Sequence, residues 1–331
     1  MAPVSLLRLG TPSLIQTAFC PPRIRSRSFG TAGKSSNDFL PGIKRIVLIR
    51  HGESLGNIDE RAYQTTADWR IPLTNKGREQ GRLAGQKIDS LLHVDASGAQ
   101  LAEKGKVYFY VSPYLRTRQT LREMLREVDK KSIVGIREDP RITEQQFGNF
   151  QHHAEMQDNK VCNATQSILI LRHYDTWCHL THDIQAQRID FGRFFYRFPS
   201  GGESGFDVYN RVSGFIGTIT RDVQNIWEEL HPETPDISNT NEEEDESVTI
   251  CIVTHGLTLR LFLMRWFQYS VHEFERSYNP QNGRVVVLDL NKCGRFNLSE
   301  VDRIAMGFPL YREQERFKLM DDYSILDRSN W

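Results

Sequence analysis

The stretch that decides the fold is "VLIRHGESLGN", Val47 to Asn57, in which an apolar run passes directly into arginine, histidine and glycine. The run begins at Ile43, and its β-branched residues predict a strand that is buried on both faces. Arg50 therefore stands at the end of a buried strand, where an unpaired charge is costly. Either Arg50 forms a salt bridge and the polar residues are incidental, or a pocket for an anion begins there.

Predicted strands and predicted helices alternate along the rest of the chain. We expect strands at residues 43–50, 106–113, 132–139, 247–256 and 284–290, and helices at residues 73–92, 116–128, 205–223 and 257–267. The first of these helices has Thr74 as its expected N-cap. This order predicts an α/β fold, a three-layer α/β/α sandwich with a mostly parallel sheet.

Polar side chains follow the predicted strands at the point where each strand ends. They are Arg50-His51-Gly52, Ser112-Pro113 with Arg116 beyond, Arg141 and Glu144, and His255-Gly256. In sheets of this kind, ligands bind outside the carboxyl ends of the strands. The sequence therefore predicts one shared pocket at that edge of the sheet.

The residue types in this set suit a phosphoryl group, which carries about two negative charges near neutral pH. Arg50 and Arg116 each offer a fork of donors that matches phosphate oxygens, and Asn57 offers a neutral donor. As an alternative, Arg116 is a solvated residue in the first turn of its helix. A cation is disfavoured at that end of a helix dipole, which favours a bound anion there.

The histidines and the acid supply the groups for phosphoryl transfer. A neutral His51 can attack phosphorus, and a protonated His255 can stabilise charge on the equatorial oxygens. Glu144 is the candidate that protonates the leaving oxygen and later activates water. A lone histidine is usually structural, but these two stand at two strand ends and support each other. None of these steps needs a metal or a cofactor.

Five ordered segments carry a resemblance to a known family: "RHGES", "LTNKGREQG", "SPYLRTRQT", "GGESGFDVYNRV" and "VTHG". The chain resembles the histidine phosphatase superfamily, the phosphoglycerate mutase-like proteins, over most of Ile43 to Leu290. The wording of "FGRFFYRFP" is most similar to a plant phosphoglycerate mutase-like branch.

The resemblance implies a role for each matching position. His51 would be the phosphorylated nucleophile, and Glu144 lies in the region of the proton donor. Arg50, Arg116 and His255 would complete the phosphate pocket, with Asn57 as a further phosphate contact. In addition, Gly52 is expected to let the backbone pass close to the ligand, and Ser54 to add a hydroxyl donor.

Two differences from the mutase pattern favour a phosphatase. The loop after the first motif reads "QTTADWRIP" instead of an aromatic-rich "FTGW" type, and Glu144 is followed by Gln145, Gln146 and Phe147 instead of arginine and tyrosine. We therefore expect a phosphomonoesterase that acts on a small phosphorylated metabolite. The first alternative is a phosphoglycerate mutase in which Arg61, Arg70 or Arg141 replaces the lost cations. The second is a catalytically weak, phosphate-binding regulatory protein.

Composition limits the partners of the chain. Its formal net charge is zero, and no apolar run is long enough to span a bilayer, so we expect neither a nucleic-acid partner nor a membrane partner. The five cysteines form no close pair, which favours a reducing compartment. The sequence leaves the oligomeric state and the particular substrate open.

The ends and the middle of the chain differ from the rest. Residues 1–37 contain no Asp or Glu but five Arg and Lys, which predicts a plastid or mitochondrial transit peptide; the alternative is a disordered tail on a cytoplasmic protein. Residues 38–331 are expected to form a single catalytic domain with an insert near residues 158–182. The insert contains Cys162, His173, Cys178, His179 and His182, but no cysteine pair has zinc-finger spacing, so we predict no metal. The alternatives for this segment are a surface loop at the pocket rim and translated non-coding sequence.

Overall fold

The computed structural model describes residues 43–59, 62–148, 182–199, 201–230, 248–292 and 294–309 of the chain. By its internal contacts the chain divides into Met1–Ser35 and Ser36–Trp331, and every described residue lies in the second unit. The predicted transit peptide and the predicted insert fall outside the described side chains, so both remain predictions.

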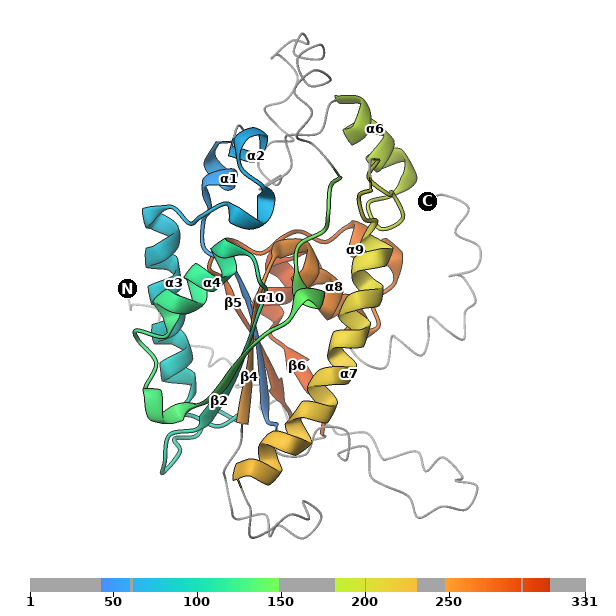
Figure 1. The fold of residues 1–331 in the computed structure, drawn as a ribbon. Coiled ribbons are helices and arrows are strands. Elements are labelled where there is room, and N and C mark those ends of the chain that lie inside the picture. Colours follow the sequence, from blue (N-terminus) through green and yellow to red (C-terminus); the bar gives the residue numbers. More distant parts are fainter. Residues whose placement is uncertain are drawn as a thin grey trace, which may run out of the picture. The chain divides into compact units, whose positions relative to one another are not determined.

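The described strands form one six-stranded sheet in the order β3-β2-β4-β1-β5-β6 (Figure 1). Their bounds are β1 Arg45–Arg50, β2 Lys106–Val111, β3 Ile133–Glu138, β4 Val248–Thr254, β5 Val285–Leu290 and β6 Phe296–Leu298. The pairs β1–β4, β2–β4 and β2–β3 are parallel, while β1–β5 and β5–β6 are antiparallel. The predicted mostly parallel sheet is therefore confirmed.

The sequence pattern did not foresee the direction of β5 or the existence of β6. The chain reaches β5 from the carboxyl edge of the sheet, where the Gly283 amide donates to the carbonyls of Arg50 and His51, both at 3.1 Å. A strand that starts beside the end of β1 has to run back against it, which makes β5 antiparallel.

Helices cover both faces of the sheet, as predicted. Their bounds are α1 Leu55–Ile58, α2 Ala62–Thr65, α3 Asn75–Leu91, α4 Leu115–Met124, α6 His182–Phe191, α7 Gly205–Leu230, α8 Gly256–Phe267, α9 Val271–Glu275 and α10 Glu300–Ala305. Short 3-10 turns, η2 Asp68–Arg70, η3 Lys130–Ser132 and η4 Pro140–Ile142, lie between them. In Figure 1, α3 and α4 lie on one side of the sheet, and α7 and α8 lie on the other. Within the described ranges, no helix is both long enough and apolar enough to cross a membrane.

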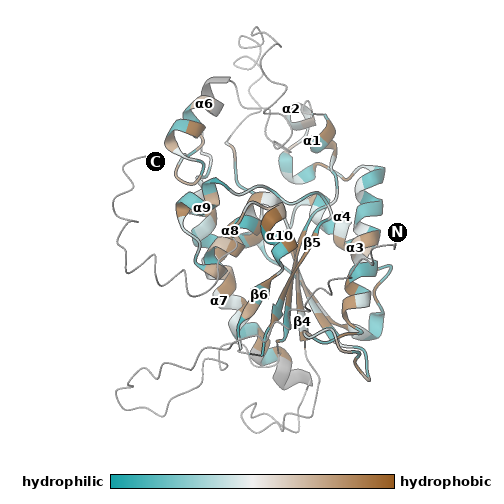
Figure 2. Cartoon of the chain, turned by 180° about the vertical axis from the view of Figure 1, so that it is seen from behind, coloured by the Kyte–Doolittle hydropathy of each residue, from teal (hydrophilic) through white to brown (hydrophobic). Residues whose placement is uncertain are grey.

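Strand β1 is buried on both faces because its side chains alternate between two cores. Val47 and Ile49 pack with residues of α3 and α4, while Ile46 and Leu48 pack with residues of α7 and α8. The strands are accordingly hydrophobic along their length, whereas the outer helices carry hydrophilic faces (Figure 2). The continuous apolar run that ends at Arg50 is thus the signature of a central strand.

Helices α3 and α4 approach each other closely because α3 presents glycines to its neighbour. A Cβ atom built on Gly85 would lie 2.5 Å from the Met124 carbonyl oxygen. The helix starts where the sequence predicted, since the Thr74 hydroxyl accepts a hydrogen bond from the Gly77 amide at 3.0 Å. This close packing fixes α3 and α4 against the side of the sheet on which Arg116 lies.

The register of the parallel strands brings the predicted site together. Arg50 at the end of β1 is level with Thr254 at the end of β4, and Val111 at the end of β2 is level with Val253. The residues that follow, His51, His255 and Ser112, therefore leave the sheet side by side. Helices α1, α2 and α6 lie beyond this edge (Figure 1).

Candidate active site

His51 is buried at the end of β1, and its hydrogen bond shows which ring nitrogen carries the proton. Its side chain is only 2% exposed, and its amide donates to the Thr254 carbonyl at 2.9 Å. Its Nδ1 lies 2.7 Å from the Gly52 carbonyl oxygen, which can only accept, so Nδ1 carries the proton and Nε2 the lone pair. Burial lowers the pKa of His51 well below its ordinary value, and the charges of Arg116 and Arg50 lower it further. The imidazole is therefore neutral at neutral pH, as a nucleophile requires.

His255 lies beside His51 at the end of β4. The two ring centroids are 5.2 Å apart, and His255 Nε2 lies 2.8 Å from the Ser112 hydroxyl. Its Nδ1 is buried and has no hydrogen-bond partner among the described residues. Burial lowers the pKa of His255 well below its ordinary value, as do the charge of Arg116 and then that of His51. The protonated form expected from the sequence therefore needs the negative charge of a bound group.

Two buried arginines flank the histidines. Arg50 is 1% exposed and donates through Nη1 to the Pro280 carbonyl at 2.5 Å. Arg116 is 3% exposed, and its guanidinium lies over the Tyr114 ring, 4.8 Å from the ring centroid. Arg116 also forms an ion pair with Asp68, at 2.7 Å between Nη1 and Oδ1. Both arginines thus lie close enough for their charges to act on His51, and Arg116 has a carboxylate partner that the sequence did not predict.

The two polar atoms of the Asn57 side chain differ in their hydrogen bonds: Oδ1 accepts several, whereas Nδ2 donates none among the described residues. Its Oδ1 accepts from the Ser54 amide at 2.9 Å, the Ser54 hydroxyl at 3.0 Å and Asn282 Nδ2 at 3.1 Å. Its Nδ2 is buried and has no partner within the described residues. This arrangement turns the amide so that its donor is left for a ligand, in line with the predicted phosphate contact.

The expectation for Ser54 was wrong. Ser54 is fully buried, and its hydroxyl proton goes to Asn57 Oδ1 instead of to a ligand. Ser54 orients Asn57 and is the N-cap residue of α1.

Glycine at position 52 also has a steric reason within the protein. A Cβ atom on Gly52 would lie 2.2 Å from the Gly77 carbonyl oxygen at the start of α3. The Gly52 amide donates to the Thr120 hydroxyl of α4 at 3.0 Å. Glycine is therefore required because the backbone passes between α3 and α4, and the approach of this backbone to a ligand stays a prediction.

Glu144 is buried in the segment after η4, with 5% of its surface exposed. Burial raises the pKa of Glu144. The charge of Arg116 and a hydrogen bond from the Gln145 amide lower it, and the charge of Asp68 raises it by a smaller amount. A carboxyl group of raised pKa keeps its proton to a higher pH, which a general acid requires. Its environment therefore fits the predicted proton donor.

A family profile matches most of the chain. The profile of the histidine phosphatase superfamily (branch 1) matches residues 46–167 and 168–302, which is most of the chain. The chain belongs to the histidine phosphatase superfamily. The predicted resemblance and the prediction of an enzyme of this class are both confirmed.

Three known proteins illustrate the range of similarity. Phosphoglycerate mutase-like protein AT74H of Arabidopsis thaliana is 42% identical over 256 residues, which cover 77% of each chain. Broad-range acid phosphatase DET1 of Saccharomyces cerevisiae is 26% identical over 326 residues, covering 75% of this chain and 85% of that one. A mycobacterial glucosyl-3-phosphoglycerate phosphatase of known structure is 18% identical, with a TM-score of 0.47, and the match covers 77% of this chain and 97% of that one. The predicted likeness to plant phosphoglycerate mutase-like proteins is thus confirmed.

In this histidine phosphatase superfamily member, the segment that carries Glu144 is tied down by backbone contacts. Arg211 of α7 donates to the carbonyls of Arg141 at 2.7 Å, Thr143 at 2.9 Å and Glu144 at 3.0 Å. Glu203 holds Arg211 from the other side, with contacts of 3.0 and 3.1 Å. Glu203 therefore has a structural role.

The cations proposed to replace those of a mutase are engaged elsewhere. Arg141 pairs with Asp139 at 2.5 Å and donates to the Thr218 hydroxyl of α7 at 2.7 Å. Arg70 is exposed, with its guanidinium over the Trp69 ring at 4.5 Å. Arg61 lies outside the described residues. The suggestion that Arg141 serves the pocket was therefore wrong, because its donors face α7.

The sequence missed several residues of the site. Tyr63 of α2 is close enough for the charges of Arg116, Asp68 and Glu144 to affect it, and burial raises the pKa of Tyr63 to about 12. The Tyr114 ring lies 4.9 Å from the His255 ring, centroid to centroid. Tyr114 stands between Ser112 and Arg116 in "SPYLR", so its position was a usable signal, whereas nothing in the loop marked Tyr63 or Asp68.

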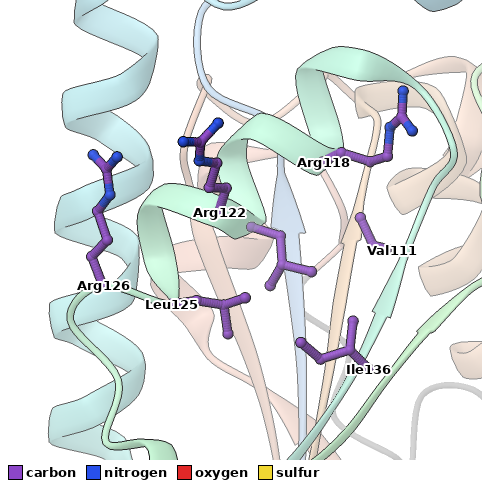
Figure 3. A pocket seen from close by; sticks show the side chains of 7 residues that line it. Val111, Arg118, Arg122, Leu125, Arg126 and Ile136 are labelled. Carbon is purple, nitrogen blue, oxygen red and sulfur yellow. The ribbon is translucent and has the colours of Figure 1, made fainter.

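Outside this site, the described residues offer no cluster of metal ligands but line a surface hollow. Among the described residues, no group of three or more His, Cys, Asp or Glu side chains could hold a metal ion. A surface hollow of about 400 Å³ lies between α4 and the strands β2 and β3, with arginines of α4 above an apolar floor (Figure 3). It is lined by Val111, Arg118, Leu121, Arg122, Leu125, Arg126 and Ile136, none of which is a predicted site residue.

Proposed function

We propose that this chain is a phosphomonoesterase that hydrolyses a small phosphorylated metabolite through a phosphohistidine on His51. The observation that carries the proposal is the hydrogen bond between His51 Nδ1 and the Gly52 carbonyl at 2.7 Å. It leaves a neutral Nε2 as the nucleophile in a pocket that also contains Arg50, Arg116 and His255. A binding protein needs the arginines but has no use for such a nucleophile or for a buried acid such as Glu144.

The reaction proceeds in two steps that use side chains and water. In the first, His51 Nε2 bonds to phosphorus, the phosphorus–oxygen ester bond breaks, and Glu144 gives its proton to the departing oxygen. In the second, a water molecule attacks phosphorus while Glu144 takes its proton, and the phosphorus–nitrogen bond breaks. Inorganic phosphate leaves, and His51 and Glu144 return to their starting forms. Arg50, Arg116, Asn57 and a His255 protonated by the bound anion hold the phosphoryl oxygens.

Two considerations support a phosphatase over a mutase. A phosphoglycerate carries a carboxylate as well as a phosphate, and Arg141 directs its donors to Asp139 and to Thr218 of α7. The yeast relative is named as a broad-range acid phosphatase, and its activity is in keeping with the proposal.

Trapping of the intermediate tests the proposal. The full chain is incubated with a phosphomonoester labelled with radioactive phosphate and quenched in alkali, where phosphohistidine survives. Wild type should carry label on His51, and His51→Ala should carry none and lose hydrolysis by about a thousandfold or more. His93→Ala is the matched control, because His93 is about half exposed near the end of α3 and lies outside the site. Full hydrolysis by His51→Ala would refute the nucleophile assignment.

A second measurement separates the phosphatase from the mutase. The enzyme is given 3-phosphoglycerate with a bisphosphoglycerate primer, and both free phosphate and 2-phosphoglycerate are measured. Free phosphate without isomerisation supports the proposal. Isomerisation that outpaces phosphate release would make the chain a mutase.

A further inference from the structure

Asp68 is an acid placed directly beside the phosphate pocket. Arg116 Nη1 donates to Asp68 Oδ1 at 2.7 Å and to the Asp68 carbonyl at 2.8 Å. The Arg116 side chain is 3% exposed, whereas that of Asp68 is 28% exposed. Asp68 is thus the partner that borders solvent, and its carboxylate lies directly beside the Arg116 guanidinium.

The contact with Asp68 leaves part of the Arg116 guanidinium for a ligand. Only Nη1 is used, and Nε and Nη2 make no hydrogen bond within the described part of the chain. A phosphoryl group can therefore bind to these donors while Asp68 keeps Nη1. The Asp68 carboxylate then stays beside the bound phosphate and is not displaced by it.

The negative charge of Asp68 also acts on side chains near Arg116 and on Glu144, the proposed proton donor. Its charge contributes to raising the pKa of Glu144, of Tyr63 and of Tyr114. These three side chains come from three separate segments, so the negative potential spans the side of the pocket where the ester oxygen must meet Glu144. The organic part of a substrate has to lie there.

Two arginines near this region are already engaged with other residues. Arg260 is a buried arginine that interacts with the charge of Glu144, but it directs its donors to Asn279 at 2.8 Å and to Ser277 at 3.0 Å. Arg193 is paired with Glu275 at 3.2 Å. A carboxylate next to the phosphate ester would therefore meet the charge of Asp68, while Arg260 and Arg193 stay bound to other residues.

We propose that Asp68 is a specificity-determining residue, which selects phosphomonoesters with an uncharged organic part and disfavours those with a carboxylate next to the ester. Like charges brought together in a partly buried site repel strongly, whereas a hydroxyl group can donate a hydrogen bond to the carboxylate. The inference rests on the proposed function and adds a substrate class to it: neutral, hydroxyl-bearing phosphomonoesters.

The test compares two ligands that differ in one group. One is 3-phosphoglycerate, and the other is the glycerol phosphate of the same configuration, in which a hydroxymethyl group replaces the carboxylate. Binding of both to the full-length His51→Ala protein is measured by calorimetry, with and without Asp68→Asn. The amide keeps the Oδ1 acceptor for Arg116 and removes the charge. We expect His51→Ala to prefer glycerol phosphate by about tenfold or more, and Asp68→Asn to reduce that preference by about tenfold.

The control is Asp222→Asn, which removes the charge of another aspartate paired with an arginine, Arg137, at 2.5 Å. It should leave the preference unchanged, and added salt should weaken the preference only where Asp68 is present. An equal preference with and without Asp68→Asn, or no binding of either ester, would overturn the proposal. Because binding is measured without turnover, this result does not depend on hydrolysis. A failure of the proposed function would instead appear as no phosphate release by wild type.

Discussion

The proposed nucleophile is prepared by the residue next to it. His51 Nδ1 donates to the carbonyl of Gly52, so the local conformation of the chain, and not a distant partner, decides which nitrogen can attack. The same conformation requires glycine at position 52, because a side chain there would collide with Gly77. Each residue of the tripeptide "RHG" therefore has its own role. Arg50 is proposed to bind the anion, His51 is oriented by the next carbonyl, and Gly52 lets the backbone pass close to α3.

The pH dependence of the reaction follows from two pKa shifts of opposite direction. The pKa of His51 is lowered from 6.5 by burial and by Arg116 and Arg50, so the neutral form persists below that pH. The pKa of Glu144 is raised from 4.5 by burial, so the proton is kept above that pH. We therefore expect a bell-shaped profile of kcat/KM, with its rising limb below pH 6.5 and its falling limb above pH 4.5.

Glu144→Gln tests the assignment of the falling limb. The amide cannot give up a proton, so kcat/KM should drop by about 10²–10⁴-fold and no longer fall as the pH rises. The profile is measured for wild type and variant with one phosphomonoester. A falling limb that persists in Glu144→Gln would assign it to another group.

At the scale of elements, α7 matters although it supplies none of the proposed catalytic side chains. Arg211 on this helix donates to three backbone carbonyls, those of Arg141, Thr143 and Glu144. Thr254 and Thr258 bind the same loop from β4 and α8, each at 2.7 Å. The acid is therefore placed mainly by hydrogen bonds to its backbone, while its carboxyl group accepts one hydrogen bond, from the Gln145 amide at 3.2 Å.

The packing of α3 on α4 gives a prediction about stability. Gly85→Ala would bring a Cβ atom within 2.5 Å of the Met124 carbonyl, so the helices must separate and the free energy of unfolding should fall by about 1–3 kcal/mol. The matched control is Gly214→Ala on α7, where no atom lies within 4 Å of the added Cβ. That change should stabilise the protein by about 0.5–1 kcal/mol, because alanine favours a helix over glycine.

Both variants are compared with wild type by urea denaturation. A Gly85→Ala protein as stable as Gly214→Ala would contradict the close approach of α3 and α4.

At the scale of the whole molecule, the sequence predicted what depends on local pattern. The strand of Ile43 to Arg50, the cap at Thr74 and the residues at the strand ends could all be read from periodicity and composition. The parallel register of β1, β2 and β4 then places His51, Ser112 and His255 together, as the rule for such sheets requires.

What the sequence did not predict depends on contacts between distant segments. Arg116 and Asp68 are 48 positions apart, and no pattern in either segment points to the other. Asn282 reaches Asn57 across 225 positions, and this contact, together with Ser54, decides which end of the Asn57 amide is left for a ligand. Such pairs form only after the sheet has brought the segments together, so spacing along the chain does not contain them.

The register of the central strands also has a consequence for how the protein folds. Val47 pairs with Cys251 at the centre of the sheet, and Ser112 meets His255 across 143 positions, so most of the chain must be ordered before the catalytic edge exists. Contacts between such distant positions form slowly, whereas helices such as α3 form within local sequence. On dilution from urea, helical circular dichroism should therefore recover first and phosphatase activity last, in step with hydrogen-exchange protection of β1 and β4. Activity that returned together with the first helical signal would show that the edge assembles before the sheet.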